Sequence, residues 1–323
     1  MPDSVIPSQE LQGVALASTP HEVGVAKPDP ILEVNHMRRT FGGLIAVDVE
    51  HLEIQRGVIT GLIGPNGAGK TTFFNLLSGF DKPDTGKTKF NGTPIDGRSP
   101  HNLARLGMVR TFQLTKSLTK LSVMENMKLG AKGQGGETFW KALIPPLWKG
   151  EERAIEKRAL GLLERFKLDH MKDEYAGTLS GGQRKLLEMA RALMAEPDII
   201  MLDEPMAGVN PALTQSLLGH VKDLRDQGIS IVFVEHDMDV VRDISDWVVV
   251  MSEGQIIAEG PHRTITANQK VIDAYLGSHH DAPLSIEEEE KFMAEDEELW
   301  DEELEEIADV LHEIDEEKHH RNE

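Results

Sequence analysis

The stretch "VITGLIGPNGAGKTTFFNLLSG", residues 58–79, decides the fold. Its first seven residues are a short, continuous apolar run that ends at a glycine, which predicts a buried strand. Its last eight residues, "TFFNLLSG", have helical spacing and stop at Gly79. Between them, "GPNGAGKT" fits the pattern G-x-x-x-x-G-K-[ST] at every fixed position. A glycine-rich loop between a strand and a helix cradles phosphate groups, so the stretch predicts a nucleoside triphosphate site, and this context disfavours a chance glycine turn.

Each residue type in this loop has a chemical reason. The glycines allow backbone N–H groups to wrap phosphate oxygens, the Lys70 ammonium reaches the β- and γ-phosphates, and the Thr71 hydroxyl suits a Mg²⁺ ion. The sequence therefore predicts a nucleotide bound together with Mg²⁺. The predicted nucleotide-binding residues of the loop are Gly64, Pro65, Asn66, Gly67, Ala68, Gly69, Lys70, Thr71 and Thr72.

Outside this loop, further strand candidates alternate with helical sequence. "DIIMLDEP" (198–205) and "ISIVFVEH" (229–236) are apolar runs, and "WVVVMSEGQIIAEG" (247–260) predicts a hairpin that turns at Glu253–Gly254. "AVDVEHLEI" (46–54) partly alternates apolar and polar residues, as a half-buried strand does. Apolar strands that alternate with helices predict an α/β fold whose parallel sheet is covered on both faces.

Two carboxylates, Asp203 and Glu204, come directly after one of these buried strands. Because side chains alternate along a strand, the two are expected to point to opposite sides. Asp203 then suits Mg²⁺ as a metal ligand, and Glu204 suits catalysis by polarising a water in line with the γ-phosphate. His236 ends another buried strand and is predicted to be catalytic by contacting the γ-phosphate. A solvated carboxylate pair and a structural histidine are the alternative interpretations.

A second glycine-containing motif, "LSGGQRK" (179–185), precedes the helical run "LLEMARALM". Backbone N–H groups at the start of a helix, loosened by glycine, form an anion site. The chain thus carries two phosphate cradles about 110 residues apart, unless the second is an ordinary helix that begins at glycines.

Composition excludes several classes of protein. The 323 residues include no cysteine, so disulfides are excluded, and no apolar run approaches the length needed to span a bilayer. The first residues have neither a basic cluster nor a long apolar core, so no secretory signal is expected. The formal net charge is −21, but residues 280–323 alone hold 20 acidic and three basic side chains. The rest of the chain is close to neutral, which disfavours a surface that binds nucleic acid.

The order of the motifs resembles a known family. The P-loop, Gln113 in "VRTFQ", "LSGGQ", "IIMLDEP" and "VEHD" together resemble the nucleotide-binding subunit of an ABC transporter, over about residues 31–278. LSGGQ is close to unique to this superfamily. The resemblance implies a P-loop NTPase of the ABC-ATPase fold, with an antiparallel β subdomain and an inserted helical subdomain. It also implies an enzyme that hydrolyses ATP with Mg²⁺.

The resemblance accounts for the second cradle. In this family two subunits stack head to tail, and each ATP lies between the P-loop of one subunit and the LSGGQ helix end of the other. The residues implied to bind the partner's nucleotide are Ser180, Gly181, Gly182 and Gln183. By the same resemblance Phe41 stacks on adenine, and Gln113 contacts both Mg²⁺ and the attacking water and couples the site to the membrane partner.

Several segments, among them "FGGLIAVD", "LSVMENMKLG" and "VEHDMDVV", resemble the ATPases of branched-chain (hydrophobic) amino-acid importers. That branch implies a homo- or heterodimer with a second ATP-binding subunit, two membrane permease subunits and, indirectly, an extracytoplasmic substrate-binding protein. It implies no nucleic acid partner and a peripheral position at the cytoplasmic face of the membrane. Urea or short-amide importers and a lipopolysaccharide-export ATPase have closely similar subunits, so substrate and direction stay open. A non-transport ABC protein is less favoured, because those usually carry two cassettes or a very long coiled coil between motifs.

The sequence divides into three parts. Residues 1–29 are predicted to be a flexible arm, residues 30–279 the nucleotide-binding domain, with its helical subdomain at about 118–177, and residues 280–323 an acidic helical tail. "SIEE" (285–288) has the pattern of a capping box, and an apolar stripe follows it at helical spacing. A solvated tail and a helix that docks on this domain or on a partner both remain open. A self-paired coiled coil is least favoured, because its facing glutamates would repel.

Overall fold

The computed structural model describes residues 16, 18–111, 118–132, 145–209 and 211–277. The residues up to Ala274 form one compact unit, and a second unit begins at Tyr275. Gln113 and the predicted acidic tail, residues 280–323, lie outside the described residues.

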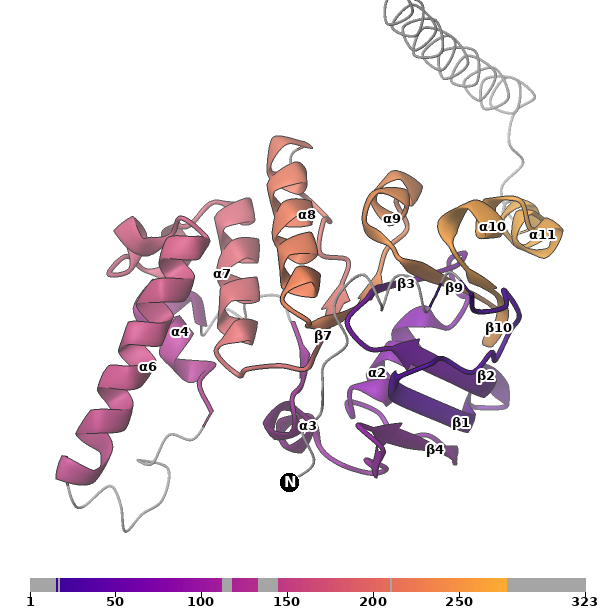
Figure 1. The fold of residues 1–323 in the computed structure, drawn as a ribbon, viewed down its shortest axis with the longest axis horizontal. Helices are drawn as coiled ribbons and strands as arrows, with labels where there is room; N and C mark the ends of the chain where they lie inside the picture. Colours follow the sequence, from indigo (N-terminus) through magenta and orange to yellow (C-terminus); the bar gives the residue numbers. More distant parts are fainter. Residues whose placement is uncertain (1–15, 17, 112–117, 133–144, 210, 278–323) are drawn as a thin grey trace, which may run out of the picture. The chain divides into compact units, whose positions relative to one another are not determined.

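An antiparallel sheet forms one side of the first unit (Figure 1). Its strand order is β2-β1-β4-β5. The strands are β1 (Pro30–Phe41), β2 (Leu44–Gln55), β4 (Thr85–Phe90) and β5 (Thr93–Pro94). The alternating stretch 46–54 lies in β2, as predicted, and buried residues alternate mostly with partly buried ones along much of this strand.

A six-stranded sheet forms the centre, in the order β10-β9-β3-β8-β7-β6. Strands β9, β3, β8, β7 and β6 run parallel, and β10 pairs antiparallel with β9. Their bounds are β3 (Ile59–Ile63), β6 (Met108–Arg110), β7 (Ile199–Asp203), β8 (Ser230–Val234), β9 (Trp247–Ser252) and β10 (Gln255–Gly260). The α/β fold with a parallel sheet is therefore confirmed, and β3 and β8 are buried along their whole length.

The two sheets share one hydrophobic core with helix α2 (Lys70–Leu77). Phe73 and Phe74 of α2 are buried in this core, which also includes Val49 of β2 and Val232 of β8. Because large apolar side chains from both sheets fix α2, the loop that precedes this helix sits on a rigid support. The remaining helices of the unit are α3 (Pro100–Leu106), α7 (Gly181–Leu193), α8 (Pro211–Asp226), α9 (Met238–Ile244), α10 (His262–Thr266) and α11 (Gln269–Gly277), which runs on into the second unit.

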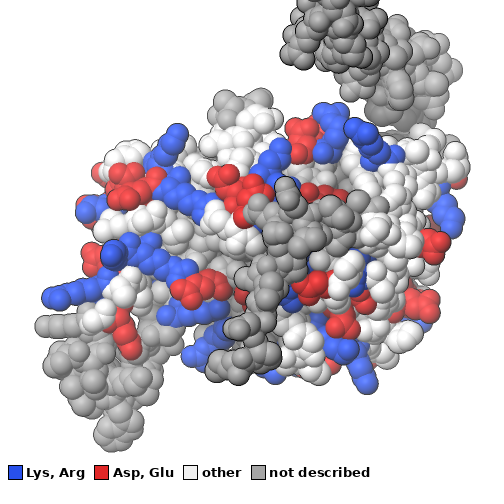
Figure 2. All heavy atoms as spheres, in the orientation of Figure 1, with Lys and Arg blue, Asp and Glu red and all other residues white. Residues whose placement is uncertain are grey.

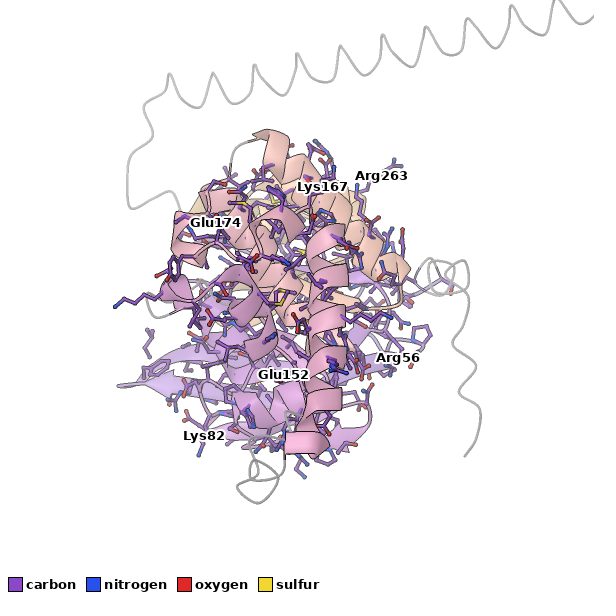
Figure 3. The ribbon with its side chains drawn as sticks, turned by 90° about the vertical axis from the view of Figure 1, so that its left-hand side faces the viewer. Arg56, Lys82, Glu152, Lys167, Glu174 and Arg263 are labelled. Carbon is purple, nitrogen blue, oxygen red and sulfur yellow. The ribbon has the colours of Figure 1, made fainter. Side chains whose placement is uncertain are left out.

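The described part of residues 118–177 is helical, as expected. It holds α4 (Val123–Leu129), α6 (Pro145–Arg165) and the short 3₁₀ turns η1 (Leu118–Lys120), η3 (Asp169–Met171) and η4 (Ala176–Thr178). Figure 1 shows α4, α6 and α7 at the end of the unit opposite β1 and β2. Figure 3 views the unit from that end, with α6 in front, Glu152 beside its first half and Lys167 just beyond its end.

The range predicted to be a flexible arm, residues 1–29, is partly packed on the domain. Lys27 is buried, and its ammonium lies 2.6 Å from Glu259 Oε2, which also accepts a hydrogen bond from the Trp247 indole N–H. The other oxygen of Glu259 accepts from the backbone N–H of Gly24. The arm prediction is therefore wrong for this part of the range: polar composition alone missed the buried acid on β10 that holds it. We call residues 21–27 the strap.

Within the described residues, no helix combines the length and the apolarity that crossing a membrane requires. On the face shown in Figure 2, Lys and Arg side chains lie among Asp and Glu side chains.

Candidate nucleotide site

The P-loop connects β3 to α2 and takes a backbone shape that needs glycine. Gly64 and Gly69 have φ angles of +147° and +94°. A Cβ atom at Gly64 would overlap the carbonyl oxygen of Met251, and one at Gly69 would overlap that of Ala46. The hairpin turn behind the loop supports it further, because the Gly254 N–H donates to the Ala68 carbonyl at 3.0 Å. The loop is thus shaped and backed by neighbouring backbone.

The start of α2 presents unused hydrogen-bond donors. In the described part of the chain, the backbone N–H groups of Gly69, Lys70 and Thr71 form no hydrogen bond. The Lys70 ammonium lies on the same loop and donates to the carbonyls of Gly64 and Pro65, at 2.6 and 2.9 Å. Burial lowers the pKa of Lys70, and the Glu204 carboxylate opposes this effect. Orphan N–H groups, a helix N-terminus and an amine together fit an anionic phosphate group.

Asp203 ends β7 and carries the carboxylate predicted to serve Mg²⁺. Its Oδ2 lies 2.6 Å from Arg110 Nη2, and about a third of the side chain is exposed. No group of three or more His, Cys, Asp or Glu side chains that could hold a metal occurs among the described residues. A carboxylate and a threonine hydroxyl fit Mg²⁺ in another way: the ion prefers oxygen ligands and takes most of them from water and from substrate phosphates. Thr71 and Asp203 are the residues that would serve it here.

Glu204 follows Asp203 in an unusual backbone conformation, with a φ of +43°. Its N–H donates to the Val234 carbonyl, which places it beside the end of β8. His236 follows that strand, and its Nδ1 lies 3.8 Å from Glu204 Oε1. Both side chains are more than half exposed. Asp203 and Glu204 thus have different partners, and the structure brings Glu204 and His236 together.

Glu235, which the sequence analysis did not single out, supports Glu204 and His236 through hydrogen bonds to the backbone next to them. It is 1% exposed, and burial raises the pKa of its carboxyl group. Its Oε1 accepts the N–H of Met206 and its Oε2 the N–H of His236. The buried side chain therefore joins the loop after Glu204 to the residue that follows β8. A carboxylate directly before a predicted reactive histidine was the available signal.

Phe41, the residue expected to stack on adenine, lies at the end of β1. Its ring is 47% exposed, and the Arg39 guanidinium carbon lies 4.6 Å from the ring centroid. Two carboxylates, Asp81 and Asp84, hold that guanidinium by ion pairs. The aromatic side chain is therefore available at the surface beside a fixed cation.

The signature motif begins α7. Ser180 is its N-cap, and a reciprocal capping box joins Ser180 and Gln183: each backbone N–H donates to the other residue's side chain. A Cβ atom on Gly182 would overlap the Leu213 side chain of α8, whereas one on Gly181 would meet only Arg184 Nη2, at an ordinary contact distance of 4.0 Å. Among the described residues, no hydrogen bond or ion pair joins Ser180–Gln183 to the P-loop.

Another residue that the sequence analysis did not single out, Lys185, connects the signature helix to the loop that follows β7. Its ammonium donates to the Glu204 carbonyl at 3.2 Å. The side chain that contacts the backbone of Glu204 therefore lies only two positions along α7 from the end of the signature, Gln183. The lysine lay within the quoted motif "LSGGQRK", but nothing in the pattern indicated its partner.

A cleft of about 370 Å³ lies between α3, β6, α4 and α7, and we call it the α3–α7 cleft. Its charged lining residues are Arg105, Arg110, Lys132, Glu188 and Arg191. Burial raises the pKa of Glu188 to about 7, against the effect of Lys185 and Arg191. The cleft thus combines an excess of basic groups with one buried acid that gives up its proton with difficulty.

The fold and the geometry define a P-loop nucleotide-binding protein. Comparisons with known families then narrow the class. Residues 47–207 match the family "ABC transporter", and residues 255–281 match "Branched-chain amino acid ATP-binding cassette transporter".

The relatives include a probable branched-chain amino acid transport ATP-binding protein LivG of Archaeoglobus fulgidus, 43% identical over 77% of this chain and 96% of the relative. The high-affinity branched-chain amino acid transport ATP-binding protein BraF of Pseudomonas aeruginosa is 40% identical over 77% and 98%. A crystal structure of a nucleotide-free ATP-binding cassette from an ABC transporter shares 37% identity and a TM-score of 0.67, covering 76% of this chain and 98% of the other. A similar cassette in its ADP conformation also has a TM-score of 0.67.

The chain therefore belongs to the ATP-hydrolysing cassettes of the ABC transporters, in the branched-chain amino acid transport family. The ABC-ATPase fold expected from the motifs is confirmed, and ATP is its nucleotide.

Proposed function

We propose that this protein is the ATPase subunit of an importer for branched-chain or other hydrophobic amino acids. The names of its relatives support the substrate class, and the complete set of ATPase motifs supports catalysis. It would act peripherally at the cytoplasmic face of a membrane, together with two permease subunits and, indirectly, an extracytoplasmic binding protein. Within the described residues no helix could cross a membrane, so membrane association would come through those partners.

The chemistry follows from the side chains at the ends of β3, β7 and β8. The P-loop N–H groups and Lys70 bind the phosphates, and Phe41 stacks on adenine. Glu204 accepts a proton from water as the water oxygen bonds to the γ-phosphorus. The bond from that phosphorus to the bridging oxygen breaks, which releases ADP and phosphate. A bound Mg²⁺ would neutralise developing phosphate charge, with Thr71, Asp203 and Gln113 as the residues that serve it.

His236 is proposed to contact the γ-phosphate beside this reaction. Its position 3.8 Å from Glu204 supports a shared role at the reacting end of the nucleotide. The strained backbone of Glu204 supports catalysis too, since such conformations cluster at active sites.

The observation that carries the proposal is that, in the part of the chain that the structure describes, no hydrogen bond or ion pair joins the P-loop to the second predicted phosphate-binding motif. The signature is a well-formed helix N-terminus that forms no hydrogen bond or ion pair with the chain's own P-loop among the described residues. We infer that Ser180, Gly181, Gly182 and Gln183 complete the nucleotide site of a second ATP-binding subunit, head to tail. ATP would then close the dimer, and hydrolysis would reopen it.

The α3–α7 cleft is proposed to receive a membrane subunit. Thr111 and Leu118 line it, and these two residues flank in sequence the segment 112–117, which lies outside the described residues. A permease segment bound there would contact Thr111 and Leu118, which are close in sequence to Gln113, the residue expected to contact the attacking water.

Glu204→Gln tests the ATPase mechanism. The amide keeps the shape of the side chain but cannot take the proton, so ATP should bind and hydrolysis should fall by about 100-fold or more. The variant should elute as a dimer on size-exclusion chromatography with ATP and Mg²⁺, and as a monomer without nucleotide. Hydrolysis at the wild-type rate would remove Glu204 from the proposed role.

Uptake assays separate import of amino acids from the other assignments. The chain would be co-expressed with candidate permease subunits and reconstituted in vesicles that contain ATP. ATP-dependent accumulation of leucine on the ATP side, absent with Glu204→Gln, is the expected result. Accumulation of urea or outward movement of a lipid would instead favour the alternative transporters.

A further inference from the structure

Arg110 is the last residue of β6 and makes contacts in two directions. Its side chain is 6% exposed. Nη2 donates to Asp203 Oδ2 at 2.6 Å, while Nη1 donates to Asn75 Oδ1 at 2.7 Å and to Ser78 Oγ at 2.9 Å. The guanidinium thus bridges β7 to the helix α2 that follows the P-loop.

This bridge connects two of the three residues proposed for Mg²⁺, Thr71 and Asp203, which are the two that the structure describes. Thr71 lies on the first turn of α2, and Asn75 lies one turn further along the same helix. Asp203 lies at the end of β7. Because one planar guanidinium bonds both α2 and the carboxylate, it fixes where the Asp203 carboxylate stands relative to Thr71.

The bond also selects an oxygen. Arg110 donates to Oδ2 of Asp203, and among the described residues no hydrogen bond is made to Oδ1, so Oδ1 is the more accessible oxygen for the metal or a metal-bound water. The Phe74 and Phe80 rings lie 4.9 and 5.6 Å from the guanidinium carbon and restrict its movement. A carboxylate that is already oriented loses less conformational entropy when it binds its ion.

We propose that Arg110 is a positioning residue for Mg²⁺: it aims the Asp203 carboxylate and holds it at a set distance from the P-loop helix. This inference rests on the proposed function, in which Mg²⁺ accompanies ATP. It assigns to Arg110 a role in metal use that is distinct from phosphate binding by the loop.

The experiment measures binding of a fluorescent ATP analogue to the full chain, first in EDTA and then at increasing Mg²⁺. Arg110→Met should raise the Mg²⁺ concentration at half-maximal effect by about tenfold, as loss of a partner to a metal-binding carboxylate does. Affinity in EDTA should stay within about twofold, because the P-loop is untouched. Arg110→Lys keeps the charge but cannot bridge both sides, so it should fall between wild type and Arg110→Met.

Arg225→Met is the matched control. Arg225 also forms an ion pair with an aspartate, Asp246, whose other oxygen accepts the N–H of Ile59 at the start of β3, at the opposite end of that strand from the P-loop. This variant should lower the thermal midpoint without changing the Mg²⁺ requirement. It separates a loss of stability from a loss of metal positioning.

A double variant tests the inference even if Arg110→Met does not fold. Asp203→Asn should raise the Mg²⁺ requirement by itself, and adding Arg110→Lys to it should cause no further rise if Arg110 acts through that carboxylate. An unchanged Mg²⁺ requirement in both Arg110 variants would overturn the inference. Equal losses of affinity for the ATP analogue in EDTA and in Mg²⁺ would also overturn it. If the wild-type chain bound no ATP at all, the proposed function itself would fall.

Discussion

Gly69 and Gly67 make a matched pair within the P-loop. Both have positive φ angles, +94° and +78°, so an L side chain is strained at either position. They differ in surroundings, because a Cβ on Gly69 would overlap the Ala46 carbonyl, whereas one on Gly67 has open space. The two positions therefore separate backbone strain from steric overlap.

Gly69→Ala should lower the free energy of unfolding by about 2–4 kcal/mol and abolish ATP binding, because the loop must shift. Gly67→Ala should lower it by only about 1 kcal/mol. Urea unfolding of both variants gives the comparison. Equal losses would show that overlap with Ala46 has no influence.

Glu188 predicts how stability depends on pH. Burial raises its pKa from 4.5 to about 7, so the folded protein holds this proton more tightly than the unfolded chain. The stabilisation is complete below pH 4.5 and is lost as the pH rises through about 7, and it amounts to about 3 kcal/mol at most. The basic neighbours Lys185 and Arg191 reduce the effect but do not cancel it.

Glu188→Gln should therefore show a smaller loss of unfolding free energy between pH 5 and pH 8 than wild type. Urea unfolding at several pH values measures both slopes. Identical slopes for the two proteins would mean that Glu188 does not cause the dependence.

At the scale of elements, the strap joins the N-terminal residues to the β9–β10 hairpin. The pair of Lys27 and Glu259 is buried, and Lys27 also lies 4.4 Å from the centre of the Trp247 ring. The turn of the same hairpin supports the P-loop through Gly254. The strap therefore holds an element on which the nucleotide site depends.

Lys27→Met should cost about 3–5 kcal/mol of unfolding free energy, since it leaves the Glu259 charge buried without its cation. The double variant with Glu259→Gln should recover part of that loss. Arg56→Met is the control: its pair with Asp29 is partly exposed and should cost less than about 1 kcal/mol. If Lys27→Met and Arg56→Met had equal effects, the buried pair would not hold the strap.

The elements that the sequence predicted well are those with a strong local signal. The P-loop strand and helix, the apolar runs that became β7 and β8, and the hairpin at Glu253–Gly254 all carry their own periodicity or glycine turn. In contrast, β1 and the three-residue β6 lack a clear apolar run, and pairing with β2 and β7 fixes them. The interpretation of residues 1–29 as a flexible arm failed in part, because the buried position of Lys27 depends on Glu259. That partner lies 232 residues away in the sequence.

The residues of the candidate site also divide into those that local sequence motifs predict and those that they do not. Lys70, Asp203, Glu204 and His236 follow from motif spacing, because parallel strands end at one edge of a sheet. Arg110, Lys185 and Glu235 act through partners that are distant in sequence, and a single chain offers no local pattern for such pairs. The roles of Gln113 and of the acidic tail stay predictions, since both lie outside the described residues.

At the scale of the whole molecule, the central claim is that two chains share each ATP. One chain supplies the P-loop and Glu204, and the other supplies Ser180 at the start of α7. A Glu204→Gln chain then cannot hydrolyse ATP at its own P-loop but keeps an unchanged LSGGQ signature for its partner. A chain with Ser180→Phe keeps Glu204 but presents a bulky side chain to its partner's nucleotide, so neither variant alone should hydrolyse ATP.

The most direct measurement is the ATPase rate of the two variants mixed in equal amounts. Random pairing makes half of the dimers mixed, and each mixed dimer has one site with an intact Glu204 and an intact signature. We predict that the mixture recovers about a quarter of the wild-type rate. A mixture as inactive as its two components, or a Ser180→Phe chain as active alone as wild type, would contradict the claim.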